Sequence, residues 1–406
     1  MGSSRWFAPL KERNFRLFFI GQSASQIGSG MAPVAIVFAV LAHGTASDVG
    51  YVLAAETVPL VILLLVGGVV GDRMSRRTLM LRSDALRTVA ECGLGVWVLS
   101  GRPPLWGFMT LAALMGIGQA FFSPALTGIV PQMLSDESLQ QGNALNGISG
   151  SSGGIIGPAI AGVIVAASSP GWAILIDGLT YLVSVVSLAL IRIDWQEAEN
   201  SEPFIVLLRQ GWREFWSRTW LWVIVIEFSL VNALYASFLV LGPVVAKQSL
   251  GGAPAWGTIL AASGIGSIIG GIVMLRFHPS RPLLTATLST LFFPVPLFLV
   301  AGRSPTFVIA LVSLLAGAFV TVFSVQWSTT LQREVPSEVL SRVSAYDWFG
   351  SLALMPIWMA LVGPVAEGIG TSTTLVVSAV AMMALIIAVL FVPSVTQLRA
   401  PARSSS

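Results

Sequence analysis

The stretch Gly68-Val69-Val70-Gly71-Asp72-Arg73-Met74-Ser75-Arg76-Arg77 joins two long apolar runs, 51–70 and 78–100. It has the pattern G-x-x-x-D-R-x-x-R-R and places four charged residues in one short turn. Each flanking run is long enough for a helix that crosses a bilayer, which needs about 20 apolar residues. The stretch therefore predicts two membrane helices that are connected by a tight, charged turn.

The composition of the whole chain agrees with a membrane protein. Of the 406 residues, 55% are hydrophobic and only 10% are charged, whereas about 25% of residues are charged in a soluble domain. Such a chain lacks the polar surface that a globule needs in water, so we expect a bilayer as its solvent. The single cysteine, Cys92, excludes an internal disulfide and supports no cysteine metal site.

Apolar runs long enough to span a membrane recur along the chain, separated by short turns with Gly and Pro. They predict an all-α membrane protein with twelve helices, at 15–41, 50–70, 78–100, 104–126, 142–167, 172–191, 220–245, 255–275, 281–301, 305–329, 340–366 and 371–393.

The basic residues are distributed unevenly between the two membrane sides that these twelve spans define. With the N-terminus in the cytoplasm, nineteen of the 22 Lys and Arg residues fall on the cytoplasmic side, Arg87 among them. The opposite side holds Arg102, Lys247 and Arg303. Because Lys and Arg are enriched in cytoplasmic loops, we expect both termini in the cytoplasm. The net charge of +3 then belongs to one membrane face, and we expect no nucleic-acid partner. The first apolar run is too long for a signal peptide, so we expect no cleavable leader.

One long break divides the predicted helices into two groups of six. We expect an N-terminal six-helix bundle at 1–191, a cytoplasmic linker at 192–219, a C-terminal six-helix bundle at 220–396 and a cytoplasmic tail at 397–406. Apolar, aromatic and Arg positions alternate in the second part of the linker. This pattern predicts an amphipathic helix at the membrane interface, with Trp212 and Trp216 toward the acyl chains. Weak echoes such as Gly157-Pro158 and Gly363-Pro364 indicate a pseudo-symmetric repeat of the two bundles.

The chain resembles the major facilitator superfamily of secondary transporters, and within it the bacterial siderophore, macrolide and multidrug exporters. The resemblance covers nearly the whole chain. Four stretches carry it: Arg13-Asn14-Phe15-Arg16-Leu17-Phe18, the Gly68–Arg77 turn, Gly153-x-x-x-Gly157-Pro158-x-x-Ala161-Gly162, and Leu340-Ser341-Arg342-Val343-Ser344-Ala345-Tyr346-Asp347.

The resemblance implies roles for two of these motifs. In the turn it implies a cytoplasmic gate formed by Gly68, Asp72, Arg73, Arg76 and Arg77. There the Gly68 position allows close helix packing, and the Asp72 carboxylate sits near the N-terminal end of the eleventh helix, where free backbone N–H groups stabilise an anion. In the fifth helix it implies a close-packing motif that tends to accompany export, made of Gly153, Gly157, Pro158 and Gly162. One departure is Ser29, which follows Gly28 where family members often carry an acid.

Acidic residues inside the predicted spans are candidates for proton coupling. A charged side chain in hydrocarbon costs roughly 2.5–3.5 kcal/mol on insertion scales, and we expect no Lys or Arg at comparable depth to neutralise it. Protonation is then the cheaper solution, and a carboxyl that gains and loses a proton suits proton antiport. The alternative is a protonated acid that only bonds a neighbouring helix. The candidates are Glu227, Glu91, Asp347, Glu56 and Asp177.

Neutral polar and aromatic residues inside the spans are candidates for lining a substrate cavity. Their alternative role is hydrogen bonding between helices. A cavity of this composition suits a bulky amphipathic substrate. The candidates are Gln22, Gln26, Gln119, Asn232, Tyr235, Gln326 and Trp327.

These patterns together predict a secondary transporter in the inner or plasma membrane that exports a drug, siderophore or natural product by proton antiport, acting as a monomer. An importer or facilitator on the same fold is the nearest alternative, and a non-transporting membrane sensor is the alternative from another class. The chain has no phosphate-binding loop of the G-x-x-x-x-G-K-[ST] type and no H-E-x-x-H or G-x-S-x-G motif. We therefore expect no enzymatic activity, no cofactor and no metal.

Overall fold

The structure is a computed structural model, and it describes residues 8–193, 204–277 and 279–399. Within these ranges the side chains of residues 64–73, 127, 136–137, 204–208, 337–338 and 341 are not described. Helices make up most of the described residues, which contain no strand. The expected all-α class is therefore confirmed.

The contacts between residues divide the chain into two compact units. Unit 1 lies within Met1–Ser201 and Ala246–Ala261, and unit 2 lies within Glu202–Val245 and Ala262–Ser406. The segment Ala246–Ala261 thus packs with unit 1, although its position in the chain is beyond the expected boundary at 192–219. The proposed division into two bundles and a linker stays a prediction.

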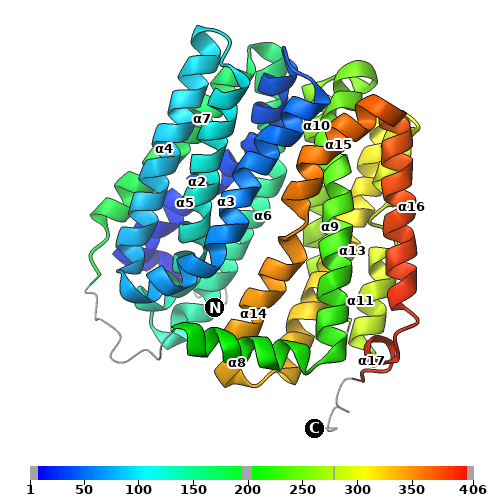
Figure 1. The fold of residues 1–406 in the computed structure, drawn as a ribbon. Helices are drawn as coiled ribbons and strands as arrows, with labels where there is room; N and C mark the ends of the chain where they lie inside the picture. The colour runs from blue at the N-terminus through cyan, green and yellow to red at the C-terminus, as the bar shows by residue number, and fades with distance from the viewer. Residues whose placement is uncertain (1–7, 194–203, 278, 400–406) are drawn as a thin grey trace. The chain divides into compact units, whose positions relative to one another are not determined.

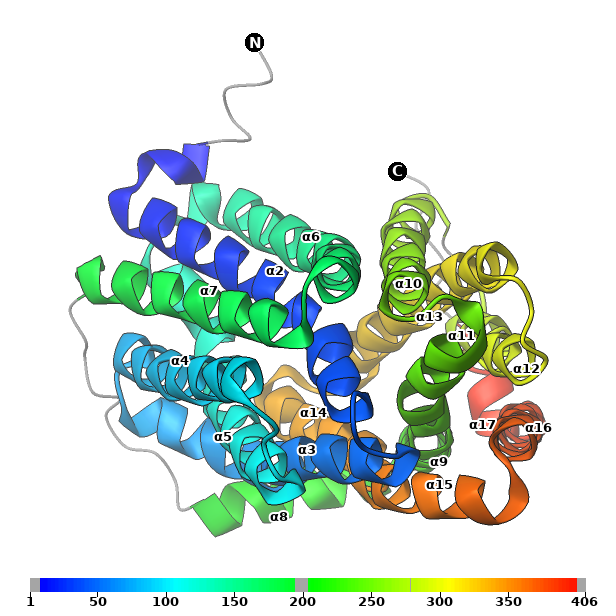
Figure 2. The ribbon, with the colours of Figure 1, turned by 90° about the horizontal axis from the view of Figure 1, so that it is seen from above.

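Unit 1 contains six long helices that pack as a series (Figure 1). They are α2 (Arg13–Leu41), α3 (Ala46–Arg73), α4 (Arg76–Ser100), α5 (Leu105–Ile129), α6 (Asp136–Ala167) and α7 (Pro170–Leu190). Helix α6 packs against α2, α2 against α7, α7 against α4, α4 against α5, and α5 against α3, an order that Figure 2 shows from above. The short elements of this unit are η1 (Ala8–Lys11), η2 (Val130–Gln132), η3 (Ala246–Leu250) and the start of α10 (Ala253–Met274).

Unit 2 is arranged around α9 (Thr219–Val245), which contacts α14, α15 and α16. The other helices of this unit are α8 (Phe204–Trp216), the remainder of α10, α11 (Pro282–Thr290), α12 (Val295–Ala301), α13 (Thr306–Glu334), α14 (Ser337–Leu352), α15 (Met355–Ile369), α16 (Thr371–Val389) and α17 (Pro393–Thr396). Helix α11 packs against α13, and α8 packs against α14.

A helix or a pair of helices lies at each of the twelve expected positions. By length and composition, eleven spans among the described residues are suited to cross a membrane. The position outside this set is α4, because Arg77, Arg82, Asp84, Arg87 and Glu91 lower its apolar character. The number of twelve membrane crossings, and with it the cytoplasmic placement of both termini, stays a prediction.

Two of the expected continuous helices are broken, which corrects the sequence prediction. The span expected at 281–301 consists of α11 and α12, with a turn at Leu291–Pro294 between them. The span expected at 340–366 consists of α14 and α15, and Pro356 lies in the first turn of α15. Proline lacks a backbone N–H, and its ring clashes with the preceding turn, so it is tolerated at the start of α15 and ends the helix before it.

The turn between α3 and α4 is as short as the sequence indicates. Helix α3 ends at Arg73 and α4 begins at Arg76, which leaves only Met74 and Ser75 between them. The Ser75 hydroxyl accepts a hydrogen bond from the Thr78 backbone N–H at 3.5 Å and so caps the start of α4.

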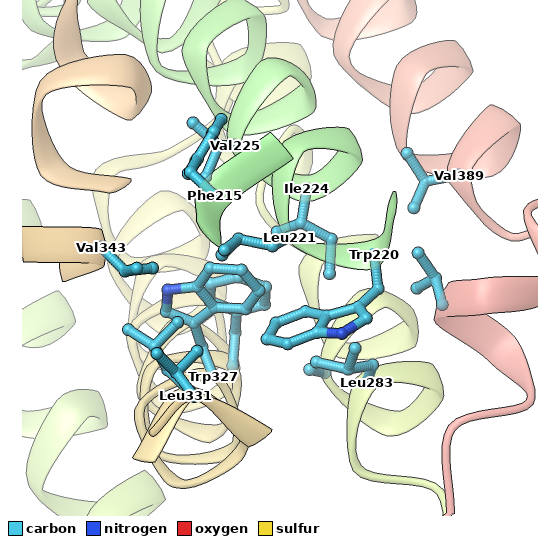
Figure 3. Packing of buried hydrophobic residues seen from close by; sticks show 14 residues of the cluster. Phe215, Trp220, Leu221, Ile224, Val225, Leu283, Trp327, Leu331, Val343 and Val389 are labelled. Atoms are coloured by element: carbon cyan, nitrogen blue, oxygen red, sulfur yellow. The ribbon is translucent and has the colours of Figure 1, made fainter. Parts of the chain in front are cut away.

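Each unit has an apolar core near one end of its helices. In unit 1 this core includes Phe15, Phe18, Met80 and Ile129. In unit 2 it includes the indole rings of Trp220 and Trp327, whose centroids lie 5.7 Å apart in an edge-to-face arrangement. Figure 3 shows the two rings with α9 side chains beside them. This packing holds Trp327 at the wall of the cavity described below.

Candidate functional site

A ladder of polar side chains lies buried between α4 and α7. Its α4 members share one helix face at i, i+3 and i+7 and are Asp84, Arg87 and Glu91. Its α7 members have the same spacing in the opposite direction and are Ser184, Tyr181 and Asp177. We call these six residues the α4–α7 ladder. Its three levels are Asp84 with Ser184, Arg87 with Tyr181, and Glu91 with Asp177.

The first two levels of the ladder form a neutral group, in which Arg87 Nε has no hydrogen-bond partner among the described residues. The Ser184 hydroxyl donates to Asp84 Oδ2 at 2.6 Å, and Arg87 Nη1 donates to Asp84 Oδ1 at 3.1 Å. The guanidinium carbon of Arg87 lies 4.7 Å from the ring centroid of Tyr181 and 5.1 Å from that of Phe122. Because both Asp84 oxygens have donors and the guanidinium supplies the opposite charge, this buried ion pair is compensated.

The position of Arg87 corrects one expectation from the sequence, which places no basic residue beside the buried acids. In the structure Arg87 is only 6% exposed and lies midway along α4. The pair Asp84-x-x-Arg87 was missed, although its i, i+3 spacing inside an apolar run could have revealed it.

The third level of the ladder brings two of the predicted acids together. Glu91 is 1% exposed and Asp177 is 0% exposed. Both Glu91 carboxyl oxygens and Asp177 Oδ2 are buried without a hydrogen-bond partner among the described residues. A Cβ built on Gly178 would lie 3.1 Å from Glu91 Cβ, so glycine lets α7 approach α4 closely at this level. Glu56, on α3, is electrostatically linked to Arg87.

The other two predicted acids, Glu227 and Asp347, belong to unit 2, and Asp347 lines a cavity of about 300 Å³. Helices α9, α13 and α14 form its walls, and its aromatic members are Phe228, Phe323, Trp327 and Trp348. The rings of Phe228 and Phe323 stack at 4.1 Å. Asp347 is the one acidic or basic side chain among the lining residues that the structure describes.

The Asp347 carboxylate is oriented by two neighbours in this cavity. Trp327 Nε1 donates to Asp347 Oδ2 at 2.9 Å, and the Ser351 hydroxyl lies 3.4 Å from Oδ1. The Asn232 amide donates to the Ser351 backbone carbonyl at 3.0 Å and so connects α9 to α14. One carboxylate surrounded by aromatic faces can bind a cationic group that also carries apolar surface.

The remaining residues predicted for a substrate cavity lie in several places. Asn232 and Trp327 line the unit 2 cavity, whereas Gln326 is buried outside its lining and Tyr235 stacks on Phe293 at 4.3 Å. Glu227 is also outside the lining, and its Oε1 is buried without a hydrogen-bond partner among the described residues.

The predicted cavity residues of unit 1 lie on α2 and α5. Gln22 is buried, and its Oε1 has no hydrogen-bond partner among the described residues. Gln26 lies along the face of α2 that contacts α6, and Gln119 donates to the Ser123 hydroxyl at 2.8 Å. Ser29, which replaces the acid common in the family, forms a 2.7 Å hydrogen bond with the Tyr181 hydroxyl of the ladder.

The predicted gate motif is described only in part. The side chains of Gly68, Asp72 and Arg73 lie outside the described residues. Arg76 donates to the Gly128 carbonyl, and Arg77 donates to the carbonyls of Leu188 and Ala189 at 2.8 Å each. The two arginines therefore bind the C-terminal ends of α5 and α7, where free carbonyls favour a cation. Their role in a gate stays a prediction.

The glycine motif of the fifth expected helix lies on α6 against α2. A Cβ on Gly153 would lie 2.3 Å from the Gln26 carbonyl oxygen, and one on Gly157 would lie 2.5 Å from the Ile27 carbonyl oxygen. A Cβ on Gly162 would lie 2.9 Å from the Ala253 carbonyl oxygen, at the start of α10. Pro158 lies inside the continuous α6. Gly153 and Gly157 therefore allow the backbones of α2 and α6 to touch, and Gly162 allows α6 to approach α10.

No group of three or more His, Cys, Asp or Glu side chains among the described residues is placed to hold a metal ion.

Comparison with known proteins places the chain in a family. The sequence profile of a family described as transmembrane secretion effector matches residues 4–405. Curated relatives include macrolide efflux protein A of Streptococcus pyogenes, which is 24% identical over 89% of this chain and 92% of its own length. The multidrug efflux pump Tap of Mycolicibacterium fortuitum is 25% identical over 91% and 93%. The enterobactin exporter EntS of Salmonella typhimurium is 27% identical over 90% and 87%.

Solved structures agree on the fold. The nucleoside transporter NupG superposes with a TM-score of 0.77 at 11% identity. The superposition covers 92% of this chain and 98% of the NupG chain. A bacterial homologue of the human lysosomal transporter Spinster gives a TM-score of 0.76 at 13% identity, with coverage of 97% and 100%. The profile match over almost the whole chain, together with this fold, shows that the protein is a transporter of the transmembrane secretion effector family within the major facilitator superfamily.

Proposed function

We propose that this transporter exports a hydrophobic or amphipathic small molecule, such as an antibiotic, a siderophore or another natural product, in exchange for protons. It acts as a monomer in the inner or plasma membrane by alternating access and catalyses no chemical reaction. The observation that carries the proposal is the aromatic cavity of unit 2 with Asp347 as its one acidic group. The relatives named as macrolide, multidrug and enterobactin exporters support the outward direction.

The chemistry of the cavity favours substrates with an apolar body and a polar or cationic group. Stacked aromatic rings supply large apolar contact area, and the faces of Phe and Trp attract cations. The Asp347 carboxylate, held by the Trp327 indole N–H, supplies an oriented acceptor at the wall. Proton coupling is supported by the buried carboxyls of both units, since a carboxyl out of water is stable when protonated and costly when charged.

The test is accumulation of ethidium and of erythromycin in an efflux-deficient bacterial host, with and without this chain and with and without a protonophore. We expect lower accumulation in cells that carry the protein and recovery after the protonophore. An Asp347→Asn variant should lose export of ethidium, a permanent cation. The matched control is Glu334→Gln, which alters an exposed acid at the end of α13.

Two outcomes would contradict the proposal. Higher accumulation in cells that carry the protein would indicate an importer, because the flux would run inward. Unchanged accumulation of every compound in a panel that adds catecholate siderophores and other antibiotics, with the protein present in the membrane, would favour the sensor alternative.

A further inference from the structure

The third level of the α4–α7 ladder has chemistry that the rest of the ladder does not share. Asp84 has a donor on each oxygen, from Arg87 and Ser184. Arginine stays charged inside proteins, so the Asp84–Arg87 pair is neutral as a unit. Glu91 and Asp177 are therefore left without a counter-ion of their own, although both are at most 1% exposed.

The hydrogen bonding of these two acids is also incomplete. Three of their four carboxyl oxygens have no partner among the described residues, and the fourth, Asp177 Oδ1, has only the Thr180 hydroxyl at 3.5 Å. An ionised carboxylate only accepts hydrogen bonds, whereas a protonated carboxyl also donates one. The described surroundings offer these two side chains almost no donor, so a bound proton would supply the donor that the site lacks.

The titratable groups around the two acids come from three helices. Helix α4 contributes Arg87, to which Asp84 is bound, and Cys92, α7 contributes Tyr181, and α3 contributes Glu56. The other helices packed against α4 and α7 contribute no acidic or basic residue beyond their first turns. Helix α5 contains no acidic or basic residue, and those of α2 and α6 lie in the first turn of each helix. With one guanidinium and four carboxyls, the group cannot keep every acid ionised at low cost.

We propose that Glu91 and Asp177 form one proton-binding site in unit 1, in which the two carboxyls share a single proton. With one proton bound, the pair carries one negative charge. The guanidinium of Arg87, which lies one helical turn before Glu91, stabilises that charge. Release of the proton to water leaves two adjacent carboxylates and strengthens the pull on the Arg87 guanidinium. This assignment rests on the proposed function and makes the pair the carrier of the coupling proton. Neither Glu91 nor Asp177 lines the cavity of unit 2.

Asp177 also lies against α2. A Cβ on Gly28 would lie 2.5 Å from Asp177 Oδ1, so this carboxyl lies directly against the glycine that precedes Ser29.

The test is the infrared spectrum of the purified full-length protein in lipid nanodiscs, recorded over a pH titration in H2O and D2O. Protonated carboxyls give a carbonyl stretching band that disappears on ionisation and shifts in D2O. We expect Glu91→Gln and Asp177→Asn each to remove the same band, and the double variant to remove no more than either single variant. Glu12→Gln, which alters an exposed acid, should leave this band unchanged.

Several results would overturn the assignment. They are a band that survives both single variants, separate bands whose losses add in the double variant, and a band displaced by Na⁺ at constant pH. If Glu91→Gln does not fold, Glu91→Asp keeps the carboxyl but moves it by one methylene. The Glu91→Asp variant must then shift the carbonyl band that Asp177→Asn removes. If that band stays at its wild-type position, the two carboxyls do not share a proton.

Transport in proteoliposomes separates this inference from the proposed function. For ethidium, we expect both single variants to retain flux down the dye gradient and to lose its stimulation by an imposed pH gradient. Variants that keep the stimulation would contradict the proton site. A wild-type protein that moves no dye or drug but shows the expected infrared behaviour would reject the proposed function and leave the shared proton in place.

Discussion

Arg87 shows how strongly one residue depends on its three-dimensional surroundings. In the sequence it follows four other arginines of the charged turn and the start of the next helix, and loop-charge counting assigns it to the cytoplasm. In the structure Asp84, Tyr181 and Phe122 surround its guanidinium. A buried guanidinium requires such partners, because an unpaired charge out of water is several kcal/mol less stable.

We predict that Arg87→Ala lowers stability strongly. The substitution leaves Asp84 as a buried charge with only the Ser184 hydroxyl as donor, and breaking a buried pair in this way costs about 3–5 kcal/mol. The measurement is the apparent unfolding temperature of the purified protein in detergent.

The control for this experiment is Arg82→Ala, which removes an exposed arginine from the same helix and should change stability by less than about 0.5 kcal/mol. The double variant Asp84→Asn/Arg87→Gln should recover part of the loss, since neither charge remains. Equal unfolding temperatures for Arg87→Ala and Arg82→Ala would disprove the structural role of the ion pair.

At the scale of elements, the contact between α2 and α6 depends on glycine. We predict that Gly153→Val and Gly157→Val each destabilise unit 1 by about 1–3 kcal/mol, the usual cost of overpacking. The new side chains would meet the carbonyl oxygens of Gln26 and Ile27, which belong to a helix backbone and cannot rotate away. Thermal unfolding and the yield of folded protein measure the effect.

The same helix offers a matched control in Gly154. A Cβ built there meets no atom within 4 Å, and replacing glycine by alanine in a helix gains up to about 1 kcal/mol. Gly154→Ala should therefore be neutral or stabilising. A loss at Gly154 as large as the loss at Gly153 would mean that the helix, rather than its contact with α2, is sensitive to substitution.

Helix α8 presents two different faces. The buried Phe215 packs against Tyr346 of α14, with ring centroids 6.2 Å apart, and the half-exposed Trp212 covers the same ring at 5.3 Å. The exposed face at i, i+3, i+4 and i+7 carries Arg209, Trp212, Arg213 and Trp216. We predict that this face lies in the lipid headgroup region, where indole rings and arginines are favourable. A Trp212→Phe/Trp216→Phe variant should then lose much of the tryptophan quenching caused by brominated lipids.

The control variant for the quenching experiment is Trp256→Phe, because Trp256 is only 1% exposed. It should leave the lipid-dependent quenching nearly unchanged. Equal quenching in the wild-type protein and the double variant would place α8 away from the bilayer.

Helix α4 has a polar face and an apolar face, which an average over the helix does not separate. Its ladder residues are buried against α7, while Val89 and Val96 are 70% and 55% exposed. The polar groups thus face protein and the apolar ones face outward, which is the arrangement that a bilayer favours. An average over the helix sums both faces and hides this difference.

For the whole molecule, the status of α4 decides the side of the C-terminus. Twelve crossings place both termini on one side, and eleven place them on opposite sides. We predict that green fluorescent protein fused after residue 406 fluoresces as brightly as the same fusion before residue 1, since both ends would be cytoplasmic. Bacterial alkaline phosphatase inserted at Arg303 should be active, because this loop would be external.

A contrary result would be a non-fluorescent fusion after residue 406 together with active alkaline phosphatase fused after the same residue. It would show that α4 does not cross the membrane. The positive-inside argument would then fail for the second half of the chain. An inactive phosphatase at Arg303, with both fluorescent fusions bright, would instead contradict the placement of the loop before α13.

The extent to which the sequence predicted the structure differs between elements. The turn between α3 and α4 follows directly from Gly68–Arg77, and a helix or helix pair lies at each expected position. The breaks at α11–α12 and α14–α15 were missed, because proline inside a membrane run is often tolerated within a continuous helix. Pro33 inside α2 is such a case.

The sequence by itself determined the all-α membrane class and the family, because both depend on local apolar length and on short motifs. Only the tertiary structure decided which polar residues meet. It paired Asp84 with Arg87 against α7, buried Glu91 and Asp177 on facing sides of α4 and α7, and joined Asp347 to Trp327 at the wall of a cavity. The reason is physical: hydrophobic transfer is a property of each segment alone, whereas a buried charge is stabilised only by partners that other helices bring to it.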